Sequence, residues 1–205
     1  MIGPKEKRER ALGEHLQLKG TRCQSPKCAL VRKPYRPGMH GKKRQRKGLS
    51  DFGKQIREKQ KFKLSYGLDE RSLRHLFLKA SLQSGSTAVR LNELLESRLD
   101  NVVFRLGIAL SRGIARQLIG HGHILVNGKR VRSPGYQVRV NDMIGVRQES
   151  LPKAAFRGLS QSLKKYDPPS WLHLDADKLE GKVLDRPHDT MPPFEVNLLV
   201  ESFNR

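Results

Sequence analysis

The chain has 205 residues, and its 41 lysines and arginines against 20 aspartates and glutamates give a formal net charge of +21. Such an excess of positive charge predicts a polyanionic partner, with nucleic acid ahead of an anionic membrane surface. The sequence has no apolar run near the roughly 18 residues that a membrane-spanning helix needs. It also lacks a signal-peptide pattern, and its two cysteines are too few for a disulfide framework. We therefore expect a protein of the cytoplasm or of an organelle matrix, with no membrane partner.

Residues 1–49 predict an irregular basic arm, because proline and glycine recur through them and few apolar residues are available for a core. The candidate RNA contacts in the arm are Arg32, Lys33, Tyr35, His40 and the cationic run of Lys42, Lys43, Arg44, Arg46 and Lys47. Such a run is as typical of a solvated tail as of a phosphate-binding segment. We expect the arm to be disordered in the free protein and to order against its partner.

Three helical patterns follow the arm. Ser50 is a good N-cap for a helix that runs to about residue 66, and Asp69 is one for a second helix that ends near residue 84. The leucine-rich residues 91–106 predict a third helix. The first of these helices offers a basic surface, and its candidate RNA contacts are Arg57, Lys59, Lys61 and Lys63.

Residues 111–146 predict a small module of helix and strands. Ser111 caps a short helix that runs to about residue 120. The apolar residues 124–126 indicate a strand, Asn127-Gly128 indicates a tight hairpin turn, and a return strand begins at Lys129. Further strands are expected at residues 136–140 and 143–146.

The helix of this module carries the strongest candidate RNA contacts. Arg112 and Arg116 stand at i and i+4, so they share one helix face. The positive end of the helix dipole adds to their attraction for phosphate. His121, Lys129 and Arg130 are further candidates, for which a purely structural or solvated role is an equal alternative.

The C-terminal stretch has a different character. Residues 151–166 allow a basic helix, residues 171–174 resemble a short strand, and residues 194–203 are apolar enough to dock on the rest of the protein. Acidic residues outnumber basic ones over residues 167–205. We therefore expect this stretch to pack on the protein itself or to meet a basic partner, and not to lie on RNA.

Together these patterns predict an α+β fold: a helical body with an extended basic N-terminal arm, plus an inserted RNA-binding module of helix and antiparallel strands. We expect the arm over residues 1–49 and the helical body over residues 50–96. The module is expected over residues 97–157, and a C-terminal segment that packs on the body over residues 158–205.

The order of these motifs resembles the family of bacterial small-subunit ribosomal protein S4 over almost the whole chain. The helix and hairpin of residues 111–128 resemble the RNA-binding module named after that family, which also occurs in other RNA-binding proteins and in enzymes. Surrounding motifs narrow the match to the family itself. They are residues 35–41, 49–53 and 57–61 in the N-terminal region, residues 95–103 at the start of the module, and residues 171–172 and 199–201 near the C-terminus.

The resemblance implies a non-enzymatic structural protein of the ribosome that is a primary binder of small-subunit ribosomal RNA. It further implies docking on a multi-helix junction of the 5′ domain, nucleation of small-subunit assembly, and an influence on translational accuracy. The partners it implies are ribosomal proteins S3 and S5 and the mRNA where it enters the subunit. The basic composition agrees with this, because proteins bind folded RNA largely through its backbone, and arginine suits phosphate.

The two cysteines raise the question of a metal. Some S4 proteins hold a structural zinc ion with four cysteines near the N-terminus, whereas this chain keeps Cys23 and Cys28 but has Glu6 and Glu9 in place of the first pair. A structural zinc site normally uses four cysteine or histidine ligands. We therefore expect neither metal nor cofactor, although the cysteine pair is a remnant that zinc could still use.

Two other classes of protein are alternatives. RNA pseudouridine synthases and aminoacyl-tRNA synthetases bear the same module, but they need a catalytic domain, and the roughly 95 residues before the module leave little room for one. The chain also lacks a Walker-type loop and a His-Glu-x-x-His motif. A membrane-surface protein would need a wide apolar helix face with a basic rim. The clearest apolar stripe, at residues 73–80, is flanked by too few charges.

Overall fold

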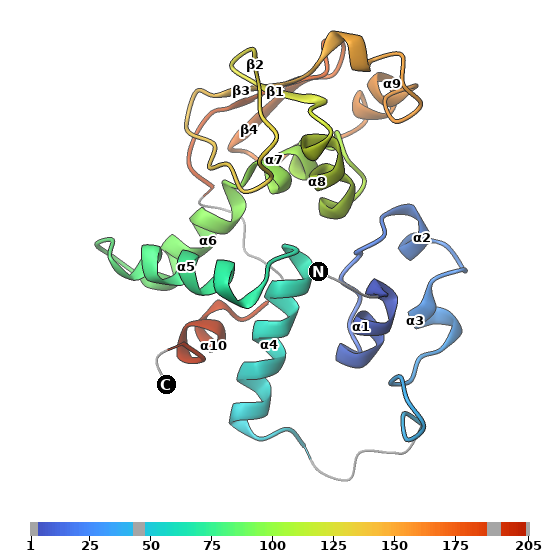
Figure 1. Ribbon diagram of the computed structural model, residues 1–205, viewed down its shortest axis with the longest axis vertical. Helices are drawn as coiled ribbons and strands as arrows, with labels where there is room; N and C mark the ends of the chain where they lie inside the picture. The colour runs from blue at the N-terminus through green and yellow to red at the C-terminus, as the bar shows by residue number, and fades with distance from the viewer. Residues whose placement is uncertain (1–3, 43–47, 188–193, 204–205) are drawn as a thin grey trace. The chain divides into compact units, whose positions relative to one another are not determined.

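The computed structural model describes residues 4–42, 48–187 and 194–203 (Figure 1). The described parts of residues 1–91 and 191–205 form one compact unit, and those of residues 92–190 form another. We call them the helical unit and the sheet unit. Helices and an antiparallel sheet are both present, which confirms the α+β class expected from the sequence.

The helical unit is built on α4 (Asp51–Ser65) and α5 (Glu70–Ser81), and each of these helices begins at a side-chain cap. The Ser50 side chain accepts a hydrogen bond from the Gly53 amide (3.2 Å), and that of Asp69 accepts one from the Ser72 amide (2.7 Å). Such caps satisfy amides that have no partner within the helix. The first two helices expected from the sequence are therefore confirmed, and α6 (Thr87–Glu96) follows them.

The C-terminal helix α10 (Val196–Glu201) packs on α4. Phe194 meets Phe62 edge-on with ring centroids 5.2 Å apart, and Phe203 stacks on Phe77 at 4.7 Å. Aromatic pairs at such distances add to the free energy gained by burial. The apolar end of the chain therefore completes the core of the helical unit.

The arm is more regular than its proline and glycine content predicts. Leu16 and Leu18 join Leu64 of α4 in a small apolar cluster, and the buried carboxylate of Glu9 accepts a hydrogen bond from the Leu18 amide (3.1 Å). These contacts anchor the arm, so the expectation of an irregular segment is wrong for its helices. Those helices are α1 (Lys5–Leu12), α2 (Thr21–Gln24) and α3 (Ala29–Arg32).

A carboxylate that joins α4 to α5 makes the helical unit sensitive to acid. Partial burial raises the pKa of Glu70, but ion pairs with Lys59 and Lys63 outweigh burial and hold that pKa below its ordinary value of 4.5. A group with a lowered pKa stabilises the fold above its unfolded-state pKa, and this contribution is lost as the pH falls through the folded-state pKa.

We therefore expect Glu70→Gln to flatten the decline in unfolding free energy below about pH 4.5. The measurement is urea unfolding followed by far-ultraviolet circular dichroism between about pH 3 and pH 6. The matched control is Glu149→Gln, which removes an exposed carboxylate from the sheet unit. An unchanged pH slope in Glu70→Gln would contradict the assignment.

The sheet unit contains one five-stranded antiparallel sheet in the order β2-β1-β3-β5-β4. Helices α7 (Leu99–Arg105) and α8 (Arg112–Gly120) pack on each other and cover the sheet (Figure 1). Leu106, Ile119, Ile144 and Trp171 are fully or almost fully buried between these layers. The strands are β1 (Ile124–Val126), β2 (Lys129–Arg130), β3 (Met143–Val146), β4 (Leu172–Asp175) and β5 (Glu180–Val183).

The third expected helix, over residues 91–106, is broken after α6. Arg98 adopts an extended conformation and bridges to Gln137, so α7 begins anew at Leu99. The Leu99 amide donates to the Tyr136 carbonyl (2.8 Å), and the Val138 amide donates to the Ser97 carbonyl (2.9 Å). The strand expected at residues 136–140 is wrong for the same reason. The backbone of residues 136–138 bonds to the chain between α6 and α7 and does not pair with the sheet.

In the C-terminal stretch, β4 confirms the short strand expected at residues 171–174, whereas β5 was not predicted and extends the sheet beside it. Strand β5 pairs with β3 through Gly181 and Ile144, so residues 172–183 belong to the sheet unit. The polar sequence of β5 gives little indication of a strand. Between β3 and β4, Pro152 and the left-handed Gly158 restrict the expected helix over residues 151–166 to the short α9 (Leu159–Leu163), and η1 (Gln148–Ser150) precedes it.

Candidate nucleic-acid interface

Helix α8 presents its two candidate arginines in different environments. The Ser111 side chain caps the helix by accepting a hydrogen bond from the Ile114 amide (3.3 Å). Arg112 turns inward: its Nε donates to Asn101 Oδ1 (2.7 Å), its guanidinium lies over the Phe104 ring, and only 16% of its side chain is exposed. Arg116, by contrast, keeps 39% of its side chain exposed. Contact with RNA stays a prediction for both, and Arg112 has an internal role besides.

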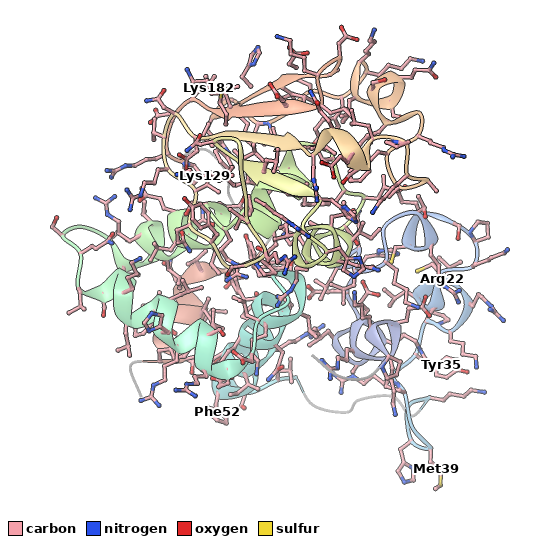
Figure 2. All side chains as sticks on the ribbon, turned by 45° about the horizontal axis from the view of Figure 1, so that its top comes forward. Arg22, Tyr35, Met39, Phe52, Lys129 and Lys182 are labelled. Carbon is pink, nitrogen blue, oxygen red and sulfur yellow. The ribbon has the colours of Figure 1, made fainter. Side chains whose placement is uncertain are left out.

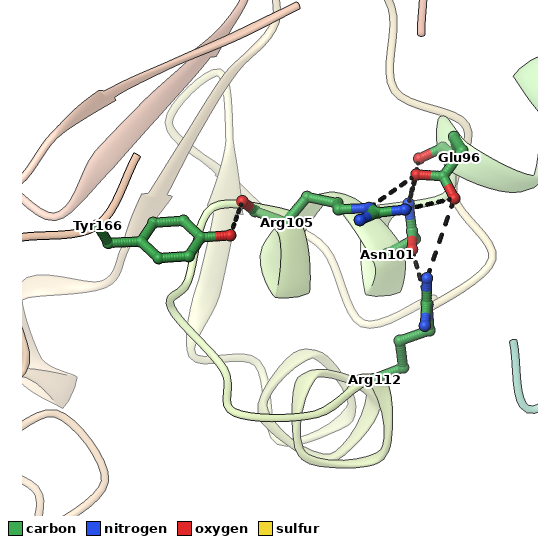
Figure 3. Close-up of polar contacts among 5 residues, drawn as sticks. All are labelled: Glu96, Asn101, Arg105, Arg112 and Tyr166. Atoms are coloured by element: carbon green, nitrogen blue, oxygen red, sulfur yellow. Dashed lines mark hydrogen bonds and ion pairs between the residues drawn. The ribbon is translucent and has the colours of Figure 1, made fainter. Parts of the chain in front are cut away.

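That internal role centres on Glu96, whose side chain is fully buried (Figure 3). Arg105 Nε and Nη2 donate to the Glu96 carboxylate at 2.9 and 3.2 Å, and Asn101 Nδ2 donates to it at 2.8 Å. Arg112 Nη2 lies 3.9 Å from the same carboxylate. The network therefore fixes α8 against the end of α6 and α7, and it places Arg116 on the outer part of the same helix.

The hairpin after α8 carries Lys129 and Arg130, which are both exposed (Figure 2 labels Lys129). Asn127 and Gly128 have φ of 50° and 74°, as expected for a turn of this type. Arg130 folds back and donates to the His121 carbonyl (3.2 Å). A Cβ on Gly122 would lie 2.0 Å from Arg130 Nε, so the glycine makes room for this arginine.

Histidines at the end of α8 lie in a strongly positive environment. His123 Nδ1 is 2.9 Å from Ser150 Oγ, and His121 is exposed beside it. Burial is the main reason why the pKa of His123 is lowered, and the positive charges of Lys153, Arg130 and Arg147 lower it further. These cations come from three separate segments, so the sheet unit gathers positive charge that no single sequence motif contains.

The basic surface expected on α4 is largely neutralised by carboxylates. Arg57 and Lys61 pair with Glu14, and Lys61 also pairs with Glu58 and keeps only 10% of its side chain exposed. Burial lowers the pKa of Lys61, but the hydrogen bonds that its ammonium donates to Glu14 and Glu58 outweigh burial and raise the pKa overall. Lys59 and Lys63 both pair with Glu70, as described above. Contact with RNA stays a prediction for all four side chains. It is least favoured for Lys61, because that side chain is buried.

The described candidates of the arm are mostly on the surface. Arg32, Lys33, His40 and Lys42 are exposed, and Tyr35 is half-buried. Lys42 lies over the Tyr35 ring at 5.3 Å. The remaining candidates, Lys43, Arg44, Arg46 and Lys47, lie outside the described residues.

The two cysteines are buried in the arm and are not joined by a disulfide. Cys28 Sγ lies 3.2 Å from His15 Nε2, and burial raises the pKa of Cys23. Glu6 is paired with Arg22 (2.6 Å), and Glu9 is held by the Leu18 amide. Over residues 4–42, 48–187 and 194–203, no group of three or more acidic, histidine or cysteine side chains is arranged to hold a metal ion.

Comparison with known proteins decides the family. Residues 1–96 match the ribosomal protein S4/S9 N-terminal domain, and residues 97–144 match the S4 domain. The small ribosomal subunit protein uS4 of Thermus thermophilus is 47% identical over 206 residues, which cover 100% of this chain and 98% of the relative. The chain belongs to the uS4 family. The uS4 of Caldicellulosiruptor saccharolyticus is 45% identical with the same coverage, and uS4A of Alkaliphilus oremlandii is 46% identical over 94% of this chain and 93% of the relative.

Membership of the uS4 family confirms the resemblance noted in the sequence. The chain is a structural protein of the small ribosomal subunit with an RNA-binding S4 domain, and it is not an enzyme. The enzyme alternative is therefore dropped. Within the part of the chain that the structure describes, no helix is both long enough and apolar enough to cross a membrane.

Several basic residues near the candidate site were not predicted. Arg147 and Lys153 contribute to the positive field around His123, and Arg10 donates hydrogen bonds to the carbonyls of Lys33 and Tyr35. Each lies outside the motifs and the dense cationic run. Only the overall charge indicated further cations, because within each unit the fold, not the spacing, brings these side chains to the predicted residues.

Proposed function

We propose that this uS4 protein is a primary binder of small-subunit ribosomal RNA, that it docks on a multi-helix junction of the 5′ domain, and that it nucleates assembly of the subunit. Its further proposed roles are contact with ribosomal proteins S3 and S5, contact with mRNA where it enters the subunit, and a contribution to translational accuracy. The observation that carries the proposal is the match to uS4 proteins over the full length of the chain.

The sheet unit supports this proposal through its charge. Arg116, Lys129 and Arg130 are accessible cations on α8 and the hairpin, and Arg147 and Lys153 add to the field around His123. Folded RNA exposes phosphates across grooves that side chains cannot easily read, so a rigid cationic surface suits it. The network around Glu96 keeps α8 fixed, which lowers the entropy cost of binding.

The test is binding to a 5′-domain fragment of small-subunit ribosomal RNA against an unrelated duplex of equal length, over a series of salt concentrations. With about six to ten phosphates neutralised, affinity for both RNAs should fall steeply with salt. At fixed salt, the cognate fragment should bind at least about a hundredfold more tightly. Equal affinity for both RNAs would show that the net charge acts alone, and the proposed docking would be abandoned.

Arg116 provides a sharper prediction for the same site. We expect Arg116→Ala to weaken binding to the cognate fragment by about tenfold and to lower the salt slope by about one. Arg116 Nη1 lies 3.8 Å from the buried carboxylate of Asp100, and the fold should survive the loss of this contact because Arg98 Nε and Nη2 still donate to Asp100 at 3.1 and 2.8 Å. Lys182→Ala is the matched control, since it removes an exposed cation from β5 (Figure 2). An equal loss in both variants would remove Arg116 from the interface.

A further inference from the structure

The arm of the helical unit forms a solvent-open pocket of about 470 Å³ that belongs to neither α8 nor the hairpin. Its walls come from α1, α2, α3 and the chain that follows α3, which includes Tyr35 (Figure 2 labels Arg22 and Tyr35). Arg10 ties these walls together, because its guanidinium donates to the carbonyls of Lys33 (3.0 Å) and Tyr35 (3.0 Å). The volume lies within the range of small-ligand sites.

The charge lining this pocket is unbalanced. Six cationic side chains and a single carboxylate, that of Glu6, line it. Glu6 is already paired with Arg22 (2.6 Å) and with Lys19 (3.6 Å). The other lining cations are Lys7, Arg10, Lys27, Arg32 and Lys33, and for none of them does the described part of the chain provide a carboxylate partner.

Like charges gathered around one cavity repel each other, so the pocket has its lowest free energy with an anion inside. Arginine and lysine together suit phosphate, through forked hydrogen bonds and point charge respectively. Several phosphates in close succession would match several cations better than one phosphate does. The chemistry of the lining therefore selects a compact oligophosphate.

The pocket is not expected to bind a nucleobase by stacking. Tyr35 is the aromatic side chain of the lining, and its ring already has Arg10 at 5.1 Å and Lys42 at 5.3 Å from its centroid. These cations compete for the ring faces on which a base would stack. Recognition should therefore depend on the phosphates and not on the base.

We infer that this arm pocket binds an oligophosphate, which is either a sharply bent stretch of RNA backbone or the phosphate chain of a free nucleotide. The inference deepens the proposed function, since RNA binding is one of its two sources, but it is tested without RNA. The probes are inorganic tripolyphosphate, ATP and orthophosphate, titrated calorimetrically into the full chain at a fixed ionic strength of about 0.1 M. We expect one saturable site, with tripolyphosphate and ATP within about threefold of each other and orthophosphate at least about tenfold weaker.

Two double variants that remove the same charge locate the site. Lys7→Gln/Arg32→Gln removes cations from two walls of the pocket, on α1 and α3. Arg71→Gln/Lys79→Gln removes two exposed cations from α5, which does not line it. We expect at least about tenfold weaker tripolyphosphate binding in the first variant and less than about twofold in the second. Equal losses in both variants, or ATP binding far tighter than tripolyphosphate, would overturn the inference.

A measurement on the unmodified protein covers the event that the first variant does not fold. Saturating tripolyphosphate should slow tryptic cleavage after Lys27 and Arg32, while cleavage after Arg71 and Lys79 is unchanged. Mass spectrometry of the fragments provides both readings in one digest. Uniform slowing, or none, would contradict a bound ligand in the pocket.

Adding the 5′-domain RNA fragment distinguishes RNA backbone from a free nucleotide as the source of the phosphates. It also separates failure of the pocket inference from failure of the proposed function. Displacement of tripolyphosphate by the fragment assigns the pocket to RNA backbone, whereas simultaneous binding assigns it to a free nucleotide. If the fragment binds specifically but tripolyphosphate does not bind, the pocket inference fails and the proposed function stands. If tripolyphosphate binds as expected but the protein does not distinguish the fragment from the unrelated duplex, the proposed function fails alone.

Discussion

Replacing Glu96 with alanine is expected to lower the unfolding free energy of the sheet unit by about 3–5 kcal/mol. The Glu96 side chain is fully buried and accepts hydrogen bonds from Asn101 and Arg105, with Arg112 close by. Removing one partner of a buried charged network leaves the others without compensation in a medium that solvates them poorly. Arg105 can partly reach water, whereas Asn101 is fully buried and cannot.

Urea unfolding followed by Trp171 fluorescence measures this effect directly. Trp171 is the single tryptophan of the chain and is buried in the core of the sheet unit. The control is Glu149→Ala, whose carboxylate is 72% exposed and pairs with Arg147, and a pair of that kind is worth at most about 1 kcal/mol. If the two variants unfold at the same urea concentration, the Glu96 network does not hold the sheet unit together.

The second large effect is expected where β5 meets α7. A Cβ added to Gly181 would lie 2.5 Å from both Cδ methyls of Leu106, which is itself fully buried. Gly181→Ala should therefore cost about 1–3 kcal/mol through overpacking. Leu106→Ala should cost about 2–5 kcal/mol, because it leaves a cavity under the sheet.

The two changes should compensate each other when combined. In Gly181→Ala/Leu106→Ala the new methyl group occupies space that the leucine vacates, so the loss in unfolding free energy should be smaller than the sum of the single losses. Trp171 fluorescence during urea unfolding again provides the measurement. Strictly additive losses would show that Gly181 and Leu106 do not limit each other's packing.

Much of the fold was predictable wherever local chemistry decides it. Ser50, Asp69 and Ser111 cap the helices that they were expected to cap, and Asn127-Gly128 forms the expected turn. The errors occur where distant segments decide the outcome. Strand β5 exists because β3 and β4 pair with it, and the helix break at Arg98 exists because residues 136–138 bind the backbone there.

In the candidate site, too, local sequence predicts some features, whereas distant segments decide the others. Spacing predicts that Arg112 and Arg116 share a helix face, but it cannot reveal that Asn101 and Glu96 engage the first and that the second stays accessible. The α4 cations show this most clearly. Arg57 and Lys61 pair with Glu14 of the arm, more than forty positions earlier in the sequence, and no periodicity within α4 indicates this partner.

The pairing order of the sheet also bears on how the chain folds during its own synthesis. Strand β3 has only one neighbour until β5 has been translated, so an unpaired edge is exposed on the nascent chain in the interval. The helical unit likewise waits for α10 to cover α4. Both units are thus completed by residues made late, and a ribosome that stalls after β3 would release a polypeptide with an open edge and an uncovered core. Such a product is prone to aggregation and is a natural substrate for chaperones and proteases.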